Sequence, residues 1–485
     1  MAEQEEAIAF LAAGAEEIFT THISCVFLKG DRAWKLKRAV RFPYVDYTSL
    51  SARKAFCEKE LALNRRTAPS LYRRVRALTR DAAGGLEWDG PGEPVDYVLE
   101  MRRFPDDALF ARMAAQGKIS PDLLRELTDK IAAFHAGAEI VDGVGLRRVI
   151  EGNQERLLAS CPPFARAEVE ALNQAVLAAF TTQATLLASR AAQGRVRRCH
   201  GDLHLGNILL LDGHPALFDC IEFSDEFACI DVLYDLAFLL MDLLRRGDAA
   251  GAALVANRYL DVSGDEAGWA LLPLFIAVRA CIRAHVSVAQ GKAEAGDYLA
   301  LASQALRPAR PCLVAIGGFS GCGKSALAAS LAPHFAPVPG ARVLRSDVLR
   351  KRLAGVAPET RLPESAYTNA ARERVYAYML DLAEAALRGG ACVILDAAQL
   401  QVQERGAAAA LAARLGVAFH GVWLDAPDAV LEARLTARRN DASDAGVEVL
   451  RAQRQSAEPA AGWQLVDAAQ PTALQCGQVL RAMGR

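Results

Sequence analysis

One short loop limits the fold of this 485-residue chain more than any other feature, the sequence GFSGCGKS at 318–325. It follows the apolar run 312–316 and precedes a predicted helix that begins near Ala326. Glycines allow such a loop to wrap its backbone N–H groups around phosphate oxygens, and the helix N-terminus adds a positive dipole end. Lys324 is then expected to reach the β- and γ-phosphates of ATP, and Ser325 to ligate Mg²⁺. The glycines of this predicted phosphate site are Gly318, Gly321 and Gly323.

The residues after this loop alternate between strand-like and helical patterns. Strand-like runs at 342–345, 391–395 and 418–424 are separated by helical sequence, which is typical of an α/β domain with a parallel sheet. Asp347 follows the first of these runs, at the edge of the sheet where ligands bind, and there it could orient an acceptor hydroxyl and accept its proton. The alternative interpretation is that Asp347 caps a helix at 348–354.

Three more residues of the C-terminal half have the types and positions that nucleotide chemistry requires. Asp396 ends the strand-like run 392–395, where a carboxylate near Mg²⁺ is expected. Arg434 and Arg438 are four residues apart and share one face of a predicted helix, so they could close over ATP and neutralise the transferring phosphoryl group. Arginines with this spacing are equally common on solvated helix surfaces.

A second constellation lies in the N-terminal half, at 200–207, with the sequence HGDLHLGN. Kinase-type phosphoryl transfer needs one Asp to orient the acceptor hydroxyl, and an Asn and a second Asp to hold Mg²⁺ on the phosphates. Asp202, Asn207 and Asp219 have these types and this order. A simple turn with Asn207 as a loop cap is the alternative. Asp219 ends a short apolar strand of its own, and this favours the phosphoryl-transfer site.

Length and composition favour two domains. A chain of 485 residues exceeds one ordinary domain, and the two prolines of the basic stretch 307–311 mark a linker. We therefore expect domains at 1–305 and 312–485. The formal net charge of −1 argues against a protein that coats nucleic acid, because that affinity comes from concentrated Lys and Arg.

The same composition favours a cytoplasmic protein without a membrane partner. No apolar run approaches the roughly 20 residues that cross a bilayer, and the acidic start lacks the features of a signal peptide. The eleven cysteines form no CxxC pair, so neither a zinc site nor a disulfide framework is indicated. We expect reduced and mostly buried thiols.

Residues 312 to about 480 resemble the small P-loop kinases similar to zeta toxin and gluconate kinase. The resemblance is carried by GFSGCGKS, by RSDVLRKRL from Arg345, by the ILDA strand and by RLTARRNDASDA from Arg434. It implies phosphoryl transfer to a small hydroxyl-bearing acceptor, with Asp347 as the base.

The run HGDLHLGN resembles the aminoglycoside phosphotransferase family, whose members have a protein kinase-like fold. The resemblance implies that Lys35, at the end of a predicted hairpin, anchors ATP with Glu60 as its helix partner. Lys37 and Glu58 are alternatives for this pair. The glycine-rich phosphate loop of such kinases is absent, and residues 21–24 (THIS) stand in its place. The segment DVLYDLA, with Asp231 and Asp235, resembles a family segment that braces the catalytic loop.

Together the two halves resemble the bacterial bifunctional aminoglycoside phosphotransferase/ATP-binding proteins. This implies an α/β and α+β two-domain fold, a kinase-like domain followed by a P-loop domain with a parallel sheet. The expected function is transfer of the γ-phosphate of ATP, with Mg²⁺, to hydroxyl groups of small molecules at two nucleotide sites. The alternative is a P-loop kinase or ATPase that a nucleotide- or metabolite-binding N-terminal domain regulates. The sequence leaves both acceptors and the oligomeric state open.

Overall fold

The computed structural model describes residues 2–42, 44–143, 145–437 and 442–485. By the density of its internal contacts the chain separates into two compact units. The first unit contains residues 1–148 and 185–239, and the second contains residues 149–184 and 240–485. Part of the helical sequence before the linker therefore belongs with the phosphate loop. The domain boundaries at 305 and 312 stay a prediction.

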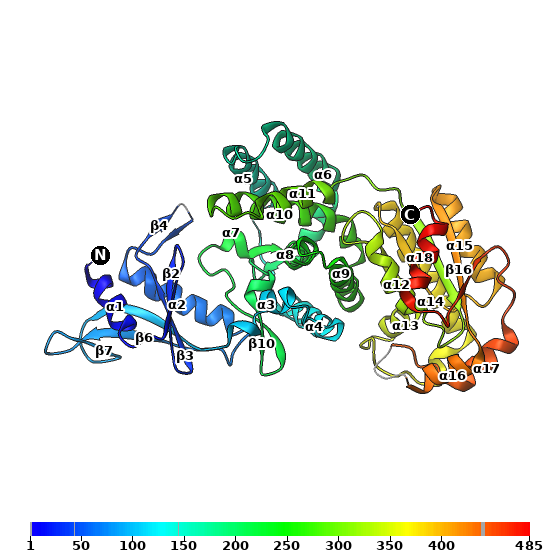
Figure 1. Ribbon diagram of the computed structural model, residues 1–485, viewed down its shortest axis with the longest axis horizontal. Helices are drawn as coiled ribbons and strands as arrows, with labels where there is room; N and C mark the ends of the chain where they lie inside the picture. The colour runs from blue at the N-terminus through cyan, green and yellow to red at the C-terminus, as the bar shows by residue number, and fades with distance from the viewer. Residues whose placement is uncertain (1, 43, 144, 438–441) are drawn as a thin grey trace. The chain divides into compact units, whose positions relative to one another are not determined.

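The first unit begins with an antiparallel sheet of six strands in the order β1-β2-β3-β8-β6-β7 (Figure 1). The predicted hairpin is confirmed, because β2 (Ser24–Lys29) and β3 (Arg32–Lys37) pair antiparallel around residues 30 and 31. The predicted helix α2 (Leu50–Asn64) begins at Ser49, whose side chain accepts the N–H of Ala52. The other elements here are α1 (Ala2–Ala12), β1 (Glu17–Thr20), β4 (Arg41–Phe42), β5 (Val45–Asp46), β6 (Tyr72–Arg80), β7 (Leu86–Trp88) and β8 (Pro94–Arg102).

The rest of the first unit is mainly helical, with short strand pairs that frame the predicted catalytic loop. β10 (Ile208–Leu211) pairs with β11 (His214–Leu217), and β9 (Val196–Arg198) pairs with β12 (Cys229–Asp231). The helix α4 (Pro121–Gly137) is capped by Ser120, whose hydroxyl accepts the N–H of Leu123. The remaining elements are η1 (Asp106–Ala108), α3 (Phe110–Ala115), η2 (Leu205–Asn207) and α7 (Asp225–Ala228).

Further helices lie before β9 and between β12 and the linker. They are α5 (Leu146–Ala159), α6 (Arg166–Ala192), α8 (Val232–Arg245), α9 (Ala249–Ser263), η3 (Glu266–Leu271), α10 (Leu272–Ala289) and α11 (Ala295–Ala305). Among the described residues one continuous helical stretch, Glu266–Ala289, is long and apolar enough to cross a membrane by length and composition alone. Of its most apolar window, 67% is buried inside the structure. Burial of this kind is what a core helix shows.

The second unit contains a five-stranded parallel sheet in the order β14-β15-β13-β16-β17. The strands are β13 (Cys312–Gly318), β14 (Arg342–Arg345), β15 (Val393–Asp396), β16 (Ala418–Asp425) and β17 (Gln464–Asp467). The first four agree with the strands predicted from the apolar runs. The fifth, at the sheet edge, has only one buried residue and gives no apolar signal.

Helices cover both faces of this sheet (Figure 1). Alternate residues of β13 divide between the two cores: Val314 packs with one set of helices, and Leu313 packs with the other. One set is α12 (Lys324–Leu331), α16 (Asp428–Ala437), α17 (Val447–Ser456) and α18 (Thr472–Ala482). The other is α13 (Ser346–Leu353), α14 (Asn369–Arg388) and α15 (Val402–Leu415); the short helices are η4 (Ala332–His334) and η5 (Glu364–Tyr367). The predicted α/β fold is confirmed.

Candidate active sites

The loop at 200–207 is held by one buried carboxylate. Asp235, from α8, accepts the backbone N–H of His200 at 3.0 Å and that of Gly201 at 2.8 Å. His135 lies 3.1 Å from the same carboxylate. Gly201 has φ +84°, and a Cβ there would lie 2.9 Å from the carbonyl oxygen of Phe227, so the turn requires glycine. The bracing role expected of Asp235 has a direct geometric basis.

Asp231, the other acidic residue of this segment, lies at the end of β12. Its carboxylate receives two hydrogen bonds from Arg190, at 2.7 and 2.8 Å, and one from the N–H of Leu233. It therefore fixes the start of α8 rather than facing the loop.

Asp202 and Asn207 lie side by side within the loop. The amide nitrogen of Asn207 donates to the Asp202 carboxylate at 2.9 Å and to the Asp202 carbonyl at 3.0 Å. This leaves the amide oxygen of Asn207 as the atom that can ligate a cation. The N–H of Phe218 donates to the backbone oxygen of Asn207, which ties the loop to the segment that carries Asp219.

Asp219 has a left-handed backbone conformation, with φ +59°. Aspartate tolerates this region better than most residues. Two side chains from distant elements support the bend: the Asp219 N–H donates to the hydroxyl of Tyr72, and the Cys220 N–H donates to the amide oxygen of Asn64. The bend is thus specified by contacts from β6 and α2.

Lys35 joins the two acidic residues expected around ATP. Its ammonium group lies 2.7 Å from Glu60 and 2.5 Å from Asp219. Burial opposes the charge of Lys35, but the carboxylates of Asp219 and Glu60 outweigh it and raise the lysine pKa well above its usual value. The geometry therefore places Lys35 between the helix partner and the expected metal ligand.

Lys37, the alternative lysine, is more deeply buried and has different partners. It lies 2.7 Å from the second carboxylate oxygen of Glu60 and 2.5 Å from Glu222, which also accepts a hydrogen bond from Tyr47. Burial raises the Glu60 pKa, but the two lysines outweigh it and lower that pKa to about 2. Glu58, the alternative carboxylate, is 57% exposed and lies 4.0 Å from Lys54. The buried cluster thus contains Glu60 and both lysines.

The segment that replaces a glycine loop closes on itself through Thr21. The Thr21 hydroxyl accepts the N–H groups of Ile23 and Ser24 and donates to the Ser24 carbonyl at 3.1 Å. Arg38 donates to the carbonyls of Thr21 and His22. Hydroxyl and arginine contacts thus fix the conformation of this turn.

In the second unit the phosphate loop connects β13 to α12, as the sequence predicts. Gly318, Gly321 and Gly323 all have positive φ. A Cβ at Gly318 would lie 2.3 Å from the Leu424 carbonyl oxygen, so only glycine fits at this position. Lys324 folds over the loop and donates to the carbonyls of Gly318 and Phe319, both at 2.9 Å.

The two residues expected to ligate Mg²⁺ at this site, Ser325 and Asp396, lie next to each other. The Ser325 hydroxyl donates to the Asp396 carboxylate at 2.6 Å. Arg345, at the end of the neighbouring strand β14, lies 3.3 Å from the same carboxylate. The two residues that the sequence predicts as ligands are thus neighbours, whereas Arg345 was not predicted as a site residue.

Asp347 lies in the first turn of α13, beyond the cap position of that helix, which is Arg345. The alternative interpretation of Asp347 as a helix cap is therefore wrong. Burial and the nearby charge of Asp396 raise the Asp347 pKa, against the lowering effects of Arg345, a hydrogen bond from Ser443 and Lys324. A carboxyl group with a raised pKa beside a metal-binding aspartate is suited to accept a proton.

Of the two arginines expected to close over ATP, one can be placed. Arg434 is exposed on α16 and donates to the carbonyl of Ala468 at 2.9 Å. The helix of Arg434 packs against the phosphate loop, since a Cβ at Gly321 would lie 2.9 Å from the Leu431 carbonyl oxygen. Arg438 lies outside the described residues.

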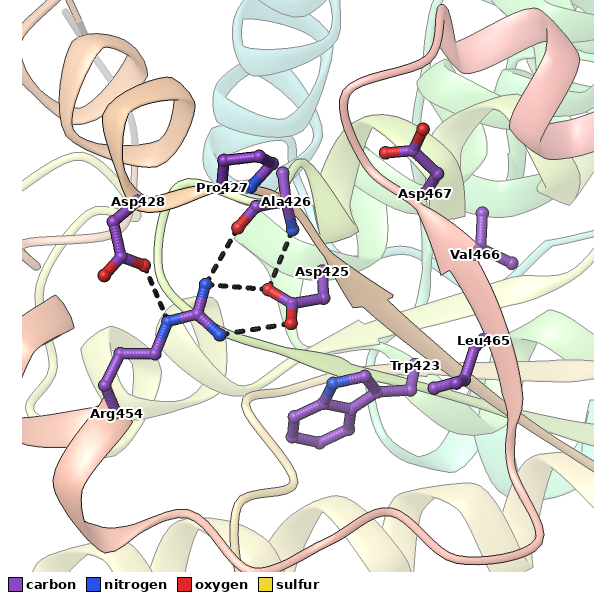
Figure 2. Close-up of a pocket in the computed structure, with 9 residues that line it drawn as sticks. All are labelled: Trp423, Asp425, Ala426, Pro427, Asp428, Arg454, Leu465, Val466 and Asp467. Carbon is purple, nitrogen blue, oxygen red and sulfur yellow. Dashed lines mark hydrogen bonds and ion pairs between the residues drawn. The ribbon is translucent and has the colours of Figure 1, made fainter.

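An open hollow of about 600 Å³ lies beside the phosphate loop, at the ends of β16 and β17 (Figure 2). Arg454 lines this hollow. Its guanidinium group forms ion pairs with Asp425 and Asp428 at 2.8 Å and lies 3.9 Å from the ring centre of Phe319. The adjacent Gln453 accepts the N–H of Ser320 at 2.8 Å. The helix α17 therefore supports the phosphate loop, and none of the predicted site residues lines the hollow.

Four residues of these sites were not found from the sequence: Tyr72, Asn64, Glu222 and Arg345. Each acts through a partner that is far away along the chain, and only Arg345 stands in a segment quoted above, RSDVLRKRL. For Glu222 a signal existed, because a second buried lysine in β3 needs a second carboxylate.

Comparison with known proteins agrees with the two expected kinds of domain. Residues 45–272 match the phosphotransferase enzyme family, and residues 313–460 match a family described as an AAA domain. Over 457 residues the chain is 33% identical to an uncharacterized protein of Mycobacterium tuberculosis, with 90% of this chain and 89% of that protein covered. An uncharacterized protein of Mycobacterium bovis matches with the same identity and coverage. The chain belongs to this two-domain phosphotransferase family.

Solved structures resemble the two parts of this family member separately. A choline/ethanolamine kinase family protein from Mesorhizobium loti is 16% identical, with 62% of this chain and 99% of that chain covered and a TM-score of 0.37. A gluconokinase from Sinorhizobium meliloti is 22% identical, with 36% and 94% covered and a TM-score of 0.28. The APS kinase of Mycobacterium tuberculosis is 20% identical, with 37% and 100% covered and a TM-score of 0.29.

The donor sets of both sites in this family member fit ATP and a divalent cation. In the first site the amide oxygen of Asn207 and the carboxylate of Asp219 are hard oxygen ligands, the type that Mg²⁺ prefers. In the second site Ser325 and Asp396 provide the same chemistry. Gly318, Gly321 and Gly323 have positive φ, the kind of backbone conformation in which such a loop turns its N–H groups toward a phosphate. The chain is thus a kinase-type phosphotransferase with a P-loop domain.

Proposed function

We propose that this protein is a bifunctional ATP-dependent phosphotransferase that transfers the γ-phosphate of ATP to hydroxyl groups of small molecules at two separate sites. The observation that carries the proposal is that one chain contains two full sets of side chains. Each set has a lysine for phosphates, two oxygen ligands for Mg²⁺ and a carboxylate for the acceptor. A regulatory domain has no need to keep such a set.

In the first site Lys35 would contact the phosphates, with Glu60 fixing its position. Asp202 would orient the acceptor hydroxyl and accept its proton, and its hydrogen bond with Asn207 at 2.9 Å holds it in place. Mg²⁺, held by Asn207 and Asp219, supplies neutralisation of the phosphate charge when bound. Because phosphoryl transfer requires little covalent help from the protein, these positioning contacts would supply most of the rate enhancement.

In the second site the backbone N–H groups of the phosphate loop and Lys324 would bind the nucleotide. Ser325 and Asp396 would hold the cation, and Asp347 would orient the second acceptor. Arg434 and Arg438 would approach the nucleotide from the side of α16. The raised pKa of Asp347 supports a role as proton acceptor, since the ideal base has a pKa closer to the working pH than a free carboxylate has.

The chemistry of the two sites indicates the class of acceptor and not the individual molecule. We propose small molecules with a free hydroxyl, and the proposal includes neither a nucleic acid nor a membrane. We also propose a cytoplasmic location, which is supported by eleven cysteines without a disulfide, ten of them buried. An aminoglycoside is one member of the acceptor class and has no special support.

A second candidate is a P-loop kinase or ATPase that the first domain regulates by binding a nucleotide or metabolite. The turn at 21–24 favours it, because Thr21 already accepts the two N–H groups that a phosphate would otherwise approach. The complete set Asp202, Asn207 and Asp219 argues against it, since a domain without catalysis has no use for all three.

The test is to incubate a bacterial small-molecule extract and Mg-ATP with the wild type, Asp202→Asn and Lys324→Ala, and to profile products by mass spectrometry. Loss of different phosphorylated products in the two variants is the expected result, and it identifies each acceptor by its mass. If Asp202→Asn leaves every product intact, the first site is not an independent catalyst, and the regulatory candidate replaces the proposal.

A further inference from the structure

A buried ionic cluster joins the helices that precede the linker to the acceptor side of the phosphate-loop sheet, all within the second unit. Arg342, the first residue of β14, is fully buried. Its guanidinium group lies 2.7 Å from Asp261 of α9 and 2.8 Å from Glu266 of η3. Burial of a charged guanidinium is costly unless it is paired, so these two carboxylates are required for β14 to begin here.

Asn257 of α9 covers the free edge of the same strand. β14 is an edge strand of the parallel sheet, and its outward backbone groups have no strand to pair with. The amide oxygen of Asn257 accepts the N–H of Val343 at 2.7 Å, and its amide nitrogen donates to the carbonyl of Ala341 at 3.1 Å. One side chain thus substitutes for a neighbouring strand.

The far end of α13 is attached to the same helices. Arg352 donates to Glu266 at 2.7 Å and to the carbonyl of Leu260 at 2.7 Å. Glu266 is therefore shared by two arginines that flank the segment 342–353. Burial raises the pKa of Glu266, but the charges of Arg342 and Arg352 outweigh it and lower that pKa, so the carboxylate is ionised at neutral pH.

Apolar packing follows the same path. Ala253 of α9 lies in the buried cluster that contains Leu327 and Leu331 of α12, the helix that follows the phosphate loop. A Cβ at Gly389, at the end of α14, would lie 3.1 Å from Ala270 of η3. The helices α9 and η3 are thus part of the packed body that contains the phosphate-loop sheet, although they precede the linker.

The segment held in this way, β14 with α13, carries Arg345 and Asp347. We propose that Glu266, Asp261 and Asn257 are positioning residues for the second active site: they hold β14 and α13, and through them Asp347, in place. The inference rests on the proposed function for the role of Asp347. It makes the P-loop kinase site dependent on helices of the preceding domain, so that the fusion of the two domains is a requirement of this site.

Amide hydrogen exchange in the full-length chain tests the proposal. Glu266→Gln removes the charge shared by Arg342 and Arg352, and Asn257→Ala is the milder variant if the first folds poorly. The expected result is exchange in peptides of 342–353 that is faster on the order of tenfold, because buried donors lose their acceptors. Peptides of 312–318 and 418–425 are expected to change little.

The chain offers a matched control at the same face. Arg258 and Glu359 form a two-bonded pair at 2.6 and 3.2 Å, with Glu359 41% exposed. Glu359→Gln is expected to alter exchange in 342–353 by less than about twofold, because exposed pairs contribute little. If Glu266→Gln behaves like this control, or if exchange rises equally across the whole sheet, the positioning role is overturned.

A ligand measurement separates positioning from general stability. In a Lys35→Ala background, the affinity of ADP with Mg²⁺ for the phosphate loop is expected to stay within about twofold for Glu266→Gln, since the contacts of Lys324 are untouched. Turnover at this site is expected to fall while the KM for ATP is unchanged. If the affinity of ADP falls by as large a factor as the turnover, the inference is overturned. Local loosening with full turnover would retain the positioning role and remove Asp347 from the proposed function.

Discussion

The two nucleotide sites of this chain differ in how charge is fixed. In the first site Lys35 and Lys37 of β3 both pair with Glu60 of α2, and Lys37 also pairs with the distant Glu222, in a buried cluster. In the second site Lys324 contacts only its own loop, through the carbonyls of Gly318 and Phe319 and the thiol of Cys322. Asp396, at the end of β15, contacts Ser325 of α12 and Arg345 of β14. The first site is therefore part of what holds its unit together, whereas the second is added to a sheet that is stable for other reasons.

Because of this difference, substitutions in the two sites are expected to affect folding stability differently. Removing one member of a buried ion pair leaves an uncompensated charge and is strongly destabilising. Removing a side chain that contacts only its own loop, and leaves no buried charge without a partner, costs less. Substitutions in the first site are thus expected to lower both folding stability and activity, and substitutions in the second are expected to lower activity alone.

The largest expected effect is on the two carboxylates assigned to the acceptors. Asp202→Asn is expected to lower turnover at the first site by about 10²–10⁴-fold, because a positioned proton acceptor contributes that much. Asp347→Asn is expected to do the same at the second site. Rates of formation of each phosphorylated product measure this. If either variant lowers both products equally, the sites are not independent.

Glu60→Gln is expected to lower the free energy of unfolding by about 3–5 kcal/mol, because it leaves Lys35 and Lys37 short of a buried anion. Glu58→Gln is the matched control on the same helix and is expected to have almost no effect, since Glu58 is exposed. Lys324→Ala is expected to resemble the control. Urea unfolding of the three variants checks the order, and equal midpoints for Glu60→Gln and Glu58→Gln would contradict the comparison.

The pH dependence of stability has opposite signs in the two sites. The folded-state pKa of Glu60 is about 2, below its ordinary value of 4.5, so its contribution is present above pH 4.5 and is lost as the pH falls toward 2. Unfolding midpoints measured between pH 2 and 5 are expected to fall less steeply for Glu60→Gln than for the wild type. A wild-type slope that is unchanged in the variant would show that Glu60 has no linkage of this kind.

Asp347 has a raised pKa, so its contribution to stability is present below its ordinary value of 3.8 and is lost as the pH rises through the folded-state value. At neutral pH the ionised Asp347 carboxylate thus lowers the free energy of unfolding. Asp347→Asn is expected to raise the free energy of unfolding by about 0.5–2 kcal/mol while it removes activity, the usual exchange at a strained site. Calorimetry at pH 7 measures this, and a loss of stability would argue against the buried environment of Asp347.

The smallest expected effect concerns the turn that replaces a glycine loop. Thr21→Ala removes the acceptor of two N–H groups, and the loss of about 0.5–1.5 kcal/mol corresponds to roughly a two- to tenfold higher KM for ATP at the first site. The product of the second site provides the internal control. An unchanged KM would mean that this turn does not take part in nucleotide binding.

The comparison also explains what the sequence could predict. The second site lies on one contiguous motif and two strand ends, so its glycines, Lys324, Ser325 and Asp396 were all found from spacing. In the first site only the loop at 200–207 and Asp219 are contiguous enough to be found in this way. The choice between Lys35 and Lys37 stayed open, because alternate strand residues were both plausible and both turned out to contact Glu60.

Residues that act through long-range contacts could not be predicted. Glu222, Tyr72 and Asn64 have ordinary local sequences, and their roles exist only after the sheet and α2 have packed. The same holds for Glu266, whose partner Arg342 is 76 residues away. The edge strand β17 was missed because only one of its residues is buried and no apolar run marks it.

The central claim is that one chain has two ATP sites, and counting them is the most direct test. Isothermal titration with a non-hydrolysable ATP analogue and Mg²⁺ would be performed on the wild type, Lys35→Ala and Lys324→Ala. The account predicts two bound nucleotides per wild-type chain and one in each variant. A single bound nucleotide in the wild type, lost in only one of the two variants, would contradict it.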